Sequence, residues 1–148
     1  MRTLHFGEAR TELPDDWRSK VDSRGVTVAA PPHQSMAFLW LSTLSGKPPD
    51  KPGFNPLEGI LSHPDAPQPT SLEDQGDCVI AQFVHTHSKL ETHTFRVLPK
   101  KAFPDRWAQA ILTLSIKQEA RDSEFVRSVV QQTWEIARKI RFDHGTKA

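Results

Sequence analysis

The fold of this chain is decided by WAQAILTLSIK at residues 107–117 and by DSEFVRSVVQQTWEIARKIR at residues 122–141. In residues 107–117 apolar side chains occupy every second position, which is typical of a strand with one buried face. In residues 122–141 apolar side chains recur every three or four positions, which predicts an amphipathic helix. A strand that leads through the short segment 118–121 into a long helix predicts a helix packed on a sheet.

Segments upstream of residue 107 add further strands, which follow one another mostly as hairpins. The predicted strands are Thr3–Leu13, a short strand that contains Val26 and Val28, Met36–Leu44, Cys78–His87 and Thr92–Leu98. Met36–Leu44 is apolar almost throughout, so we predict that it is buried on both faces. Hairpin connections favour an antiparallel sheet over a parallel one.

The predicted fold class is α+β: a mainly antiparallel sheet of five to six strands, flanked by a long C-terminal helix and a short central helix. The central helix is placed at Asn55–Leu61, with Asn55 as its N-cap and Pro56 at its first position. It lies in a proline-rich excursion at residues 46–70, which contains seven of the twelve prolines. Proline disfavours long regular elements, so the rest of the excursion is predicted to be a surface loop.

Length and composition are those of one globular domain. The 148 residues are 36% hydrophobic and 25% charged, which is ordinary for a folded protein. We predict a single domain over residues 1–148, with a frayed tail at residues 143–148. The formal net charge is +1, so there is no strong field to attract nucleic acid, and nucleic-acid binding is not expected.

The single cysteine, Cys78, excludes an intramolecular disulfide framework and indicates a reducing compartment. No apolar stretch is long enough to span a membrane, and residues 1–10 contain no apolar signal-peptide core. We therefore expect a cytoplasmic protein without membrane contact. Asp77 would raise the pKa of the Cys78 thiol, and no Gly-x-Ser-x-Gly motif or phosphate-binding glycine loop occurs. These features favour a protein that is not an enzyme and has no cofactor.

Two short patches of sequence and the order of elements resemble a known superfamily. Leu13-Pro14-x-x-Trp17 follows the first strand, and a strand, a Phe-containing helix and Ile140-Arg141-Phe142 close the chain. This layout is similar to that of the PsbP-like superfamily, which includes the photosystem II protein PsbP, the Ran-binding Mog proteins and the DcrB-like proteins. The resemblance implies an α/β/α sandwich with an antiparallel sheet. It also implies a non-enzymatic adaptor or chaperone-like role, with no shared catalytic residues.

Three histidines form a candidate metal site. His85 and His87 share a face of their strand because they are two residues apart. A hairpin register that places Phe83 opposite Phe95 also places His85 opposite His93. Three imidazoles on one face can bind zinc, copper or nickel. The alternative is that these are polar surface residues near the end of a hairpin, since their spacing matches no structural-zinc pattern.

The four tryptophans divide by their position in the predicted elements. Trp40 and Trp134 lie within elements, which predicts that they are core residues. Trp17 and Trp107 lie at the ends of elements, which makes them the better candidates for exposed contacts.

Positive charge is concentrated in residues 95–121, which carry six basic and two acidic residues. This basic stretch and the proline-rich excursion are the predicted contact surfaces for another protein or for a second copy of the chain. The predicted contact residues are Lys100, Lys101, Arg106, Trp107 and Phe54. The main hypothesis is thus a non-catalytic protein-binding adaptor or chaperone-like module that uses the open face or an edge of its sheet. The alternative is a metal-binding protein or a metal-dependent enzyme that uses the three histidines, with zinc as the metal.

Overall fold

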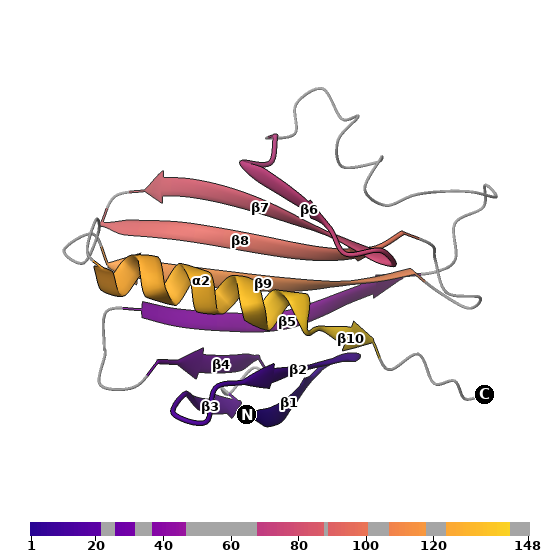
Figure 1. Ribbon diagram of the computed structural model, residues 1–148, viewed down its shortest axis with the longest axis horizontal. Helices are drawn as coiled ribbons and strands as arrows, with labels where there is room; N and C mark the ends of the chain where they lie inside the picture. Colours follow the sequence, from indigo (N-terminus) through magenta and orange to yellow (C-terminus); the bar gives the residue numbers. More distant parts are fainter. Residues whose placement is uncertain are drawn as a thin grey trace.

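The computed structural model describes residues 1–21, 26–31, 37–46, 68–87, 89–100, 107–117 and 124–142. These residues form two antiparallel sheets and one helix (Figure 1). The seven-stranded sheet has the order β3 (Arg18–Val21), β4 (Thr27–Ala30), β5 (Ala37–Gly46), β9 (Trp107–Lys117), β8 (Leu90–Pro99), β7 (Cys78–His87) and β6 (Ser71–Asp74). The three-stranded sheet has the order β1 (Arg2–Phe6), β2 (Ala9–Leu13) and β10 (Arg141–Phe142). The helix is α2 (Glu124–Arg138).

The helix and the three-stranded sheet cover the same face of the seven-stranded sheet. Figure 1 shows α2 lying along β8 and β9, and β1 approaches β5 beside it. Side chains of all three parts meet in one core, which includes Phe6, Ala9, Leu13, Trp17, Leu39, Leu41, Phe95, Leu112, Leu114, Val129 and Ile136. Burial of this apolar surface is the main favourable contribution to folding.

The two segments that predicted the fold class form the expected elements. Residues Trp107–Lys117 are a strand, and the alternation is as predicted, with Ala108, Ala110, Leu112, Leu114 and Ile116 buried. The buried residues of α2 are Val126, Val129, Thr133, Ile136 and Ala137. The strand-to-helix unit and the mainly antiparallel sheet are therefore confirmed.

The helix ends at Arg138 rather than at the predicted Arg141, because the chain turns into a strand. The main-chain N–H groups of Lys139 and Ile140 donate to carbonyls three residues earlier, both at 3.2 Å, as in a tightened last turn. β10 then pairs with β2, and Arg141 lies opposite Arg10. The short segment after the helix thus completes the three-stranded sheet.

The predicted strand Thr3–Leu13 is in fact a hairpin of β1 and β2. The chain reverses at Gly7, which has a φ of +56°, in the left-handed region that favours glycine. Gly7 packs so closely on Thr43 of β5 that no Cβ would fit, and the N–H of Glu8 donates to Thr43 Oγ1 at 3.2 Å. This turn therefore attaches the small sheet to the large one.

The predicted number of strands is too low, because the described residues form ten. The strands that were not predicted include β3 and β6, which are short edge strands with the polar sequences RSKV and SLED. β5 is not buried on both faces, since Leu39 is buried whereas Phe38 and Leu44 are exposed. Trp17 is 1% exposed and belongs to the core, so its predicted role as an exposed contact is wrong.

Several predictions concern residues that the structure does not describe. The central helix at Asn55–Leu61, residues 47–67 of the proline-rich excursion and the tail at 143–148 all lie outside the described ranges. The second helical layer of an α/β/α sandwich therefore stays a prediction.

We expect Gly7→Ala to lower the free energy of unfolding by more than Gly76→Ala does. Both glycines have a positive φ, +56° and +93°, so each substitution introduces strain of roughly 1 kcal/mol. Only at Gly7 does the added methyl group collide with Thr43, whereas the space around Gly76 is open. The collision should add about 1 kcal/mol or more, which urea denaturation of the two variants measures. Equal losses would contradict the docking of this turn on β5.

Candidate protein-binding surface

The face of the seven-stranded sheet that points away from α2 carries an apolar patch. Alternate side chains of β5 point to this face, because Leu39 and Leu41 are buried on the other one. Two of the exposed side chains are large, with Phe38 37% and Leu44 47% exposed. We define the open patch as Val28, Phe38, Trp40, Leu44 and Ile111.

Cross-strand pairing makes the open patch continuous over β4, β5 and β9. Val28 lies opposite Trp40, and Ile111 lies opposite Ser42, between Trp40 and Leu44 along β5. The rings of Phe38 and Trp40 have centroids 6.1 Å apart and are tilted by 48°. An exposed apolar patch rimmed by polar residues is typical of protein-interaction sites.

Positive charge lies on two sides of the open patch. On β8, Arg96 is opposite Ile111, and its Nε and Nη2 both donate to Oε1 of Gln109, at 2.8 and 2.6 Å. Gln109 is neutral, so these bonds orient the guanidinium without cancelling its charge. Partial burial of the guanidinium lowers the pKa of Arg96. On β3, Lys20 lies opposite Val28 and is exposed. The surface therefore suits an apolar segment that also carries acidic side chains.

The predicted metal site is not assembled by this structure. In the β7–β8 pairing His85 lies opposite Thr92 and His93 lies opposite Val84, one residue away from the predicted register. His85 is exposed, whereas His93 is buried on the side that faces α2. His87 ends β7, and its side chain is not described. Within the described ranges no three His, Cys, Asp or Glu side chains are grouped to hold a metal ion.

The register was mispredicted because β7 is apolar on both faces. Val79 and Phe83 lie on one face, and Ile80 lies on the other, so either register buries apolar side chains. The connection between β7 and β8 contains residues 88–89 rather than the predicted 88–90. A connection shorter by one residue moves the pairing by one position and reverses the face of each partner.

Both ring nitrogens of His93 have hydrogen-bonding partners. Nδ1 lies 3.2 Å from Gln82 Nε2, and Nε2 lies 2.8 Å from Glu91 Oε2. The Gln82 amide nitrogen can only donate, so Nδ1 accepts and Nε2–H donates to Glu91. Because both ring nitrogens are engaged in this way, neither is free to bind a metal ion. The cluster satisfies polar groups that are largely buried, and we assign it a structural role.

Of the predicted contact residues, Lys100 is the one whose side chain the structure describes. Its Nζ lies 2.7 Å from Asp74 Oδ2, and this hydrogen bond is the main reason that the pKa of Asp74 is lowered. Trp107 begins β9 opposite Gly46, but its side chain is not described. The residues that lie outside the described ranges are Lys101, Arg106 and Phe54.

Sequence reasoning missed the open patch, although a signal was present. Residues 38–44 read FLWLSTL, in which aromatic Phe38 and Trp40 alternate with aliphatic Leu39 and Leu41. The large aromatic side chains belong to one face and the leucines to the other. The prediction treated the aromatic and aliphatic side chains as equally apolar. It therefore overlooked the difference between the two faces and expected both to be buried.

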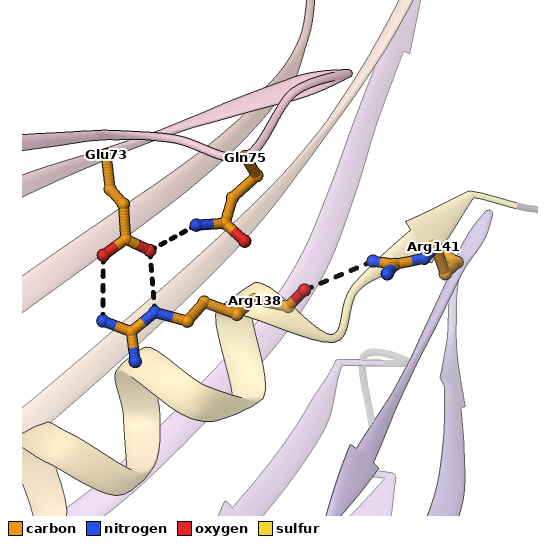
Figure 2. Close-up of polar contacts among 4 residues, drawn as sticks. All are labelled: Glu73, Gln75, Arg138 and Arg141. Carbon is orange, nitrogen blue, oxygen red and sulfur yellow. Dashed lines mark hydrogen bonds and ion pairs between the residues drawn. The ribbon is translucent and has the colours of Figure 1, made fainter.

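An ion pair joins the edge strand β6 to the end of α2 (Figure 2). Arg138 Nε and Nη2 donate to Glu73 Oε2 and Oε1 at 2.7 and 2.9 Å, and Gln75 Nε2 donates to the same Oε2 at 2.6 Å. The Arg138 guanidinium also lies 5.4 Å from the ring centroid of Trp134. The hydrogen bonds from Arg138 hold the pKa of Glu73 below its ordinary value.

We expect Glu73→Gln to lower the free energy of unfolding near pH 7 by roughly 0.5–1 kcal/mol, because the pair is partly exposed and screened. The folded-state pKa of Glu73 is lowered, so this contribution is complete above the unfolded-state pKa, about 4.3. It is lost as the pH falls through the folded-state pKa. Urea denaturation across this pH range should show the unfolding free energies of the wild type and the variant becoming equal in acid. A difference in free energy that does not change with pH would contradict the role given to the Glu73–Arg138 pair.

Cys78 is a poor nucleophile in this structure. Burial and then the charge of Asp77 raise the pKa of its thiol to about 11. The side chain borders a small cavity of about 30 Å³, which is also lined by Ala137 and Arg138 at the end of α2. A thiol of this kind is almost wholly protonated at neutral pH, so it does not support covalent catalysis.

We expect Cys78 to react with Ellman's reagent near pH 8 about a hundredfold more slowly than an unhindered thiol of ordinary pKa. The reason is the smaller thiolate fraction at a pKa of about 11. The rate should keep rising as the pH approaches that value, and the urea-unfolded chain provides the control. Fast reaction of the folded protein near pH 8 would contradict the shift.

The described chain is thus a mostly antiparallel β protein with one C-terminal helix and an apolar patch on its larger sheet. No protein-family model and no curated protein sequence matches it. The crystal structure of a protein from Bacteroides thetaiotaomicron VPI-5482 is similar in fold, with a TM-score of 0.59 and 11% identity. The match covers 91% of this chain and 45% of that one, so this chain spans less than half the length of the Bacteroides protein.

A second solved structure is that of LpqN, described as involved in cell envelope biogenesis of Mycobacterium tuberculosis. It aligns with a TM-score of 0.49 and 15% identity, over 89% of this chain and 81% of that one. The part of the chain described here contains no helix that is long and apolar enough to cross a membrane.

Proposed function

We propose that this protein is a non-catalytic adaptor or chaperone-like module that binds another protein through the open patch. The observation that carries the proposal is the exposure of Phe38 and Leu44 on the face of the sheet opposite α2. The other face of the same sheet is covered by α2 and the three-stranded sheet. Exposed side chains of this size gain free energy when a partner covers them, about 1.5–3 kcal/mol for each one fully buried.

The partner that fits this surface is a protein segment with apolar and acidic side chains. The aromatic pair of Phe38 and Trp40 offers the broad contact area that is common in interaction hot spots. Arg96 and Lys20 flank the patch and favour carboxylates at the rim of the interface. A second copy of the chain or a different protein can meet these requirements. We expect the interaction to occur in the cytoplasm, an expectation that the single Cys78 supports.

The layout of the PsbP-like superfamily supports this proposal. Leu13-Pro14-x-x-Trp17 forms a tight turn, in which the N–H of Trp17 donates to the carbonyl of Pro14 at 3.0 Å. Leu13 and Trp17, on either side of this turn, are both buried. We infer membership of that superfamily, whose members act by binding other proteins.

We expect a photo-crosslinking amino acid at Phe38 to trap a partner in cells of the source organism. The matched control position is Val21, which is 66% exposed but lies at the edge strand β3, outside the open patch. Mass spectrometry of the adducts identifies the partner. The proposal predicts adducts at Phe38 that are absent at Val21.

The affinity of the identified partner then tests the patch itself. Phe38→Ser combined with Leu44→Ser should weaken binding by roughly a hundredfold, because the exposed parts of two large apolar side chains, together worth about 3 kcal/mol when covered, are removed. Val21→Ser should leave the affinity unchanged, and calorimetry measures both. Unchanged affinity of the double variant, or equal adducts at Val21 and Phe38, would rule out the open patch. Charge reversal of Lys100, Lys101 and Arg106 tests the predicted basic stretch separately.

A further inference from the structure

The charged side chains on the open face of the seven-stranded sheet are mostly basic. The open face is the one that points away from α2 and carries the open patch. Alternate side chains of a strand share a face, and so do directly opposed residues of neighbouring strands. By this rule the open face carries four cations, which are Arg18 and Lys20 of β3, Lys117 of β9 and Arg96 of β8.

Within the seven strands, the open face carries one carboxylate, Asp74 of the edge strand β6. Its Oδ2 lies 2.7 Å from Lys100 Nζ, so its charge is balanced by that lysine. Glu73 and Glu91 point to the other face, since they lie opposite the buried Ile80 and Ile116. The ion pairs between described residues engage none of the four cations of the open face. The seven strands therefore give this face an excess of positive charge.

Lys20 and Arg96 lie on opposite sides of the open patch. The sheet order runs from β3 through β4, β5 and β9 to β8, so the two cations are roughly 20 Å apart. Lys20 lies opposite Val28 at one side of the patch, and Arg96 lies opposite Ile111 at the other. An apolar area with cations on two sides is complementary to a partner surface that has carboxylates around an apolar centre.

The structure holds Arg96 in an orientation that suits a carboxylate. Its Nε and Nη2 lie 2.8 and 2.6 Å from Oε1 of Gln109, and Nη1 takes no part in these bonds. Gln109 is 4% exposed, so its amide is a fixed support. A guanidinium that is oriented before binding loses little conformational entropy when it pairs with a carboxylate. Arg96 is also partly buried, and the attraction between opposite charges is stronger there than in bulk water.

The same charges disfavour a dimer formed through the open patch. A symmetric dimer uses the same surface on both copies, so each copy would present cations around its patch to the other. Like charges brought together across an interface cost free energy. The one carboxylate that the described strands add to this face, Asp74, is engaged by Lys100. A second copy of the chain is therefore a poor match for the surface.

We propose that the partner of the open patch is a different protein, whose contact segment combines apolar and acidic side chains. This inference rests on the proposed adaptor function and narrows it to one kind of partner. Single-stranded nucleic acid is the other polymer that offers negative charge and flat apolar groups. The patch favours protein, because Val28, Leu44 and Ile111 are aliphatic and stacking on bases requires aromatic rings. The rings of Phe38 and Trp40 are tilted by 48° and form no single flat platform.

Sedimentation velocity on the full chain tests the first part of the proposal. We expect a monomer at concentrations up to about 100 μM, because the open patch does not associate with itself. A dimer that dissociates in Phe38→Ser combined with Leu44→Ser would overturn the inference. The same result would leave the open patch in place as a protein-binding surface.

Binding of a labelled random copolymer of glutamate and tyrosine, measured by fluorescence anisotropy at low ionic strength, tests the chemistry of the partner. The wild type should bind it at least about tenfold more tightly than a copolymer of lysine and tyrosine. Lys20→Glu should weaken binding roughly tenfold, because an attraction becomes a repulsion, and Arg96→Gln should also weaken it. Arg127→Glu is the matched control, since Arg127 is exposed on α2, which covers the other face.

Three results of the copolymer experiment would overturn the inference: no binding, equal binding of both copolymers, or equal weakening by Lys20→Glu and Arg127→Glu. Tighter binding of polyuridylate than of the glutamate–tyrosine copolymer would do so as well, and would assign the face to nucleic acid. Circular dichroism confirms that each variant is folded. The proposed function fails separately, when Phe38→Ser combined with Leu44→Ser leaves the affinity of the cross-linked partner unchanged.

Discussion

The hydrogen bond from Thr11 Oγ1 to the carbonyl of Ile136, 2.6 Å long and buried, joins β2 to α2. The two elements have to lie side by side because neither is wide enough to cover the seven-stranded sheet alone. α2 covers the half that contains Phe95, and the β1–β2 hairpin covers the half that contains Leu39. The bond satisfies the hydroxyl of Thr11 inside the core, and it gives the Ile136 carbonyl a second donor beside the N–H of Lys139 at 3.2 Å.

The parts of the fold that could be predicted are those in which one periodicity dominates. Residues 107–117 alternate cleanly, and α2 repeats its apolar positions at helical spacing, so both were recognisable from the sequence. The hairpin at Gly7 was missed although the pattern changes there: the apolar positions are even before it, at Leu4 and Phe6, and odd after it, at Ala9 and Leu13. β6 was missed because it is held by pairing with β7 and by the contact of Glu73 with Arg138. Contacts with distant segments of this kind leave little trace in local sequence.

The candidate sites were less predictable than the fold, for a related reason. Whether a side chain is exposed depends on which elements pack against its strand, and that packing is known only from the tertiary structure. Phe38 became a candidate only when the core was seen to lie on the opposite side of β5. Lys20 and Arg96 are distant in sequence, and only the order of the strands places them on two sides of the same patch. The predicted metal site failed for the same reason. An error of one residue in the β7–β8 register placed His85 opposite His93, whereas the structure places them on opposite faces of the sheet.

The pairing of β10 with β2 also affects how the chain folds as it leaves the ribosome. The strands β6, β7 and β8 pair with neighbours in sequence and can form early. The β1–β2 hairpin is synthesised well before α2 and β10, which together with β5 bury its apolar face. Until residues 124–142 have been synthesised, the apolar side chains of Phe6 and Leu13 lack part of their cover. The β1–β2 hairpin is therefore the segment that waits longest for its packing partners, and it is exposed to aggregation and to capture by chaperones in that interval.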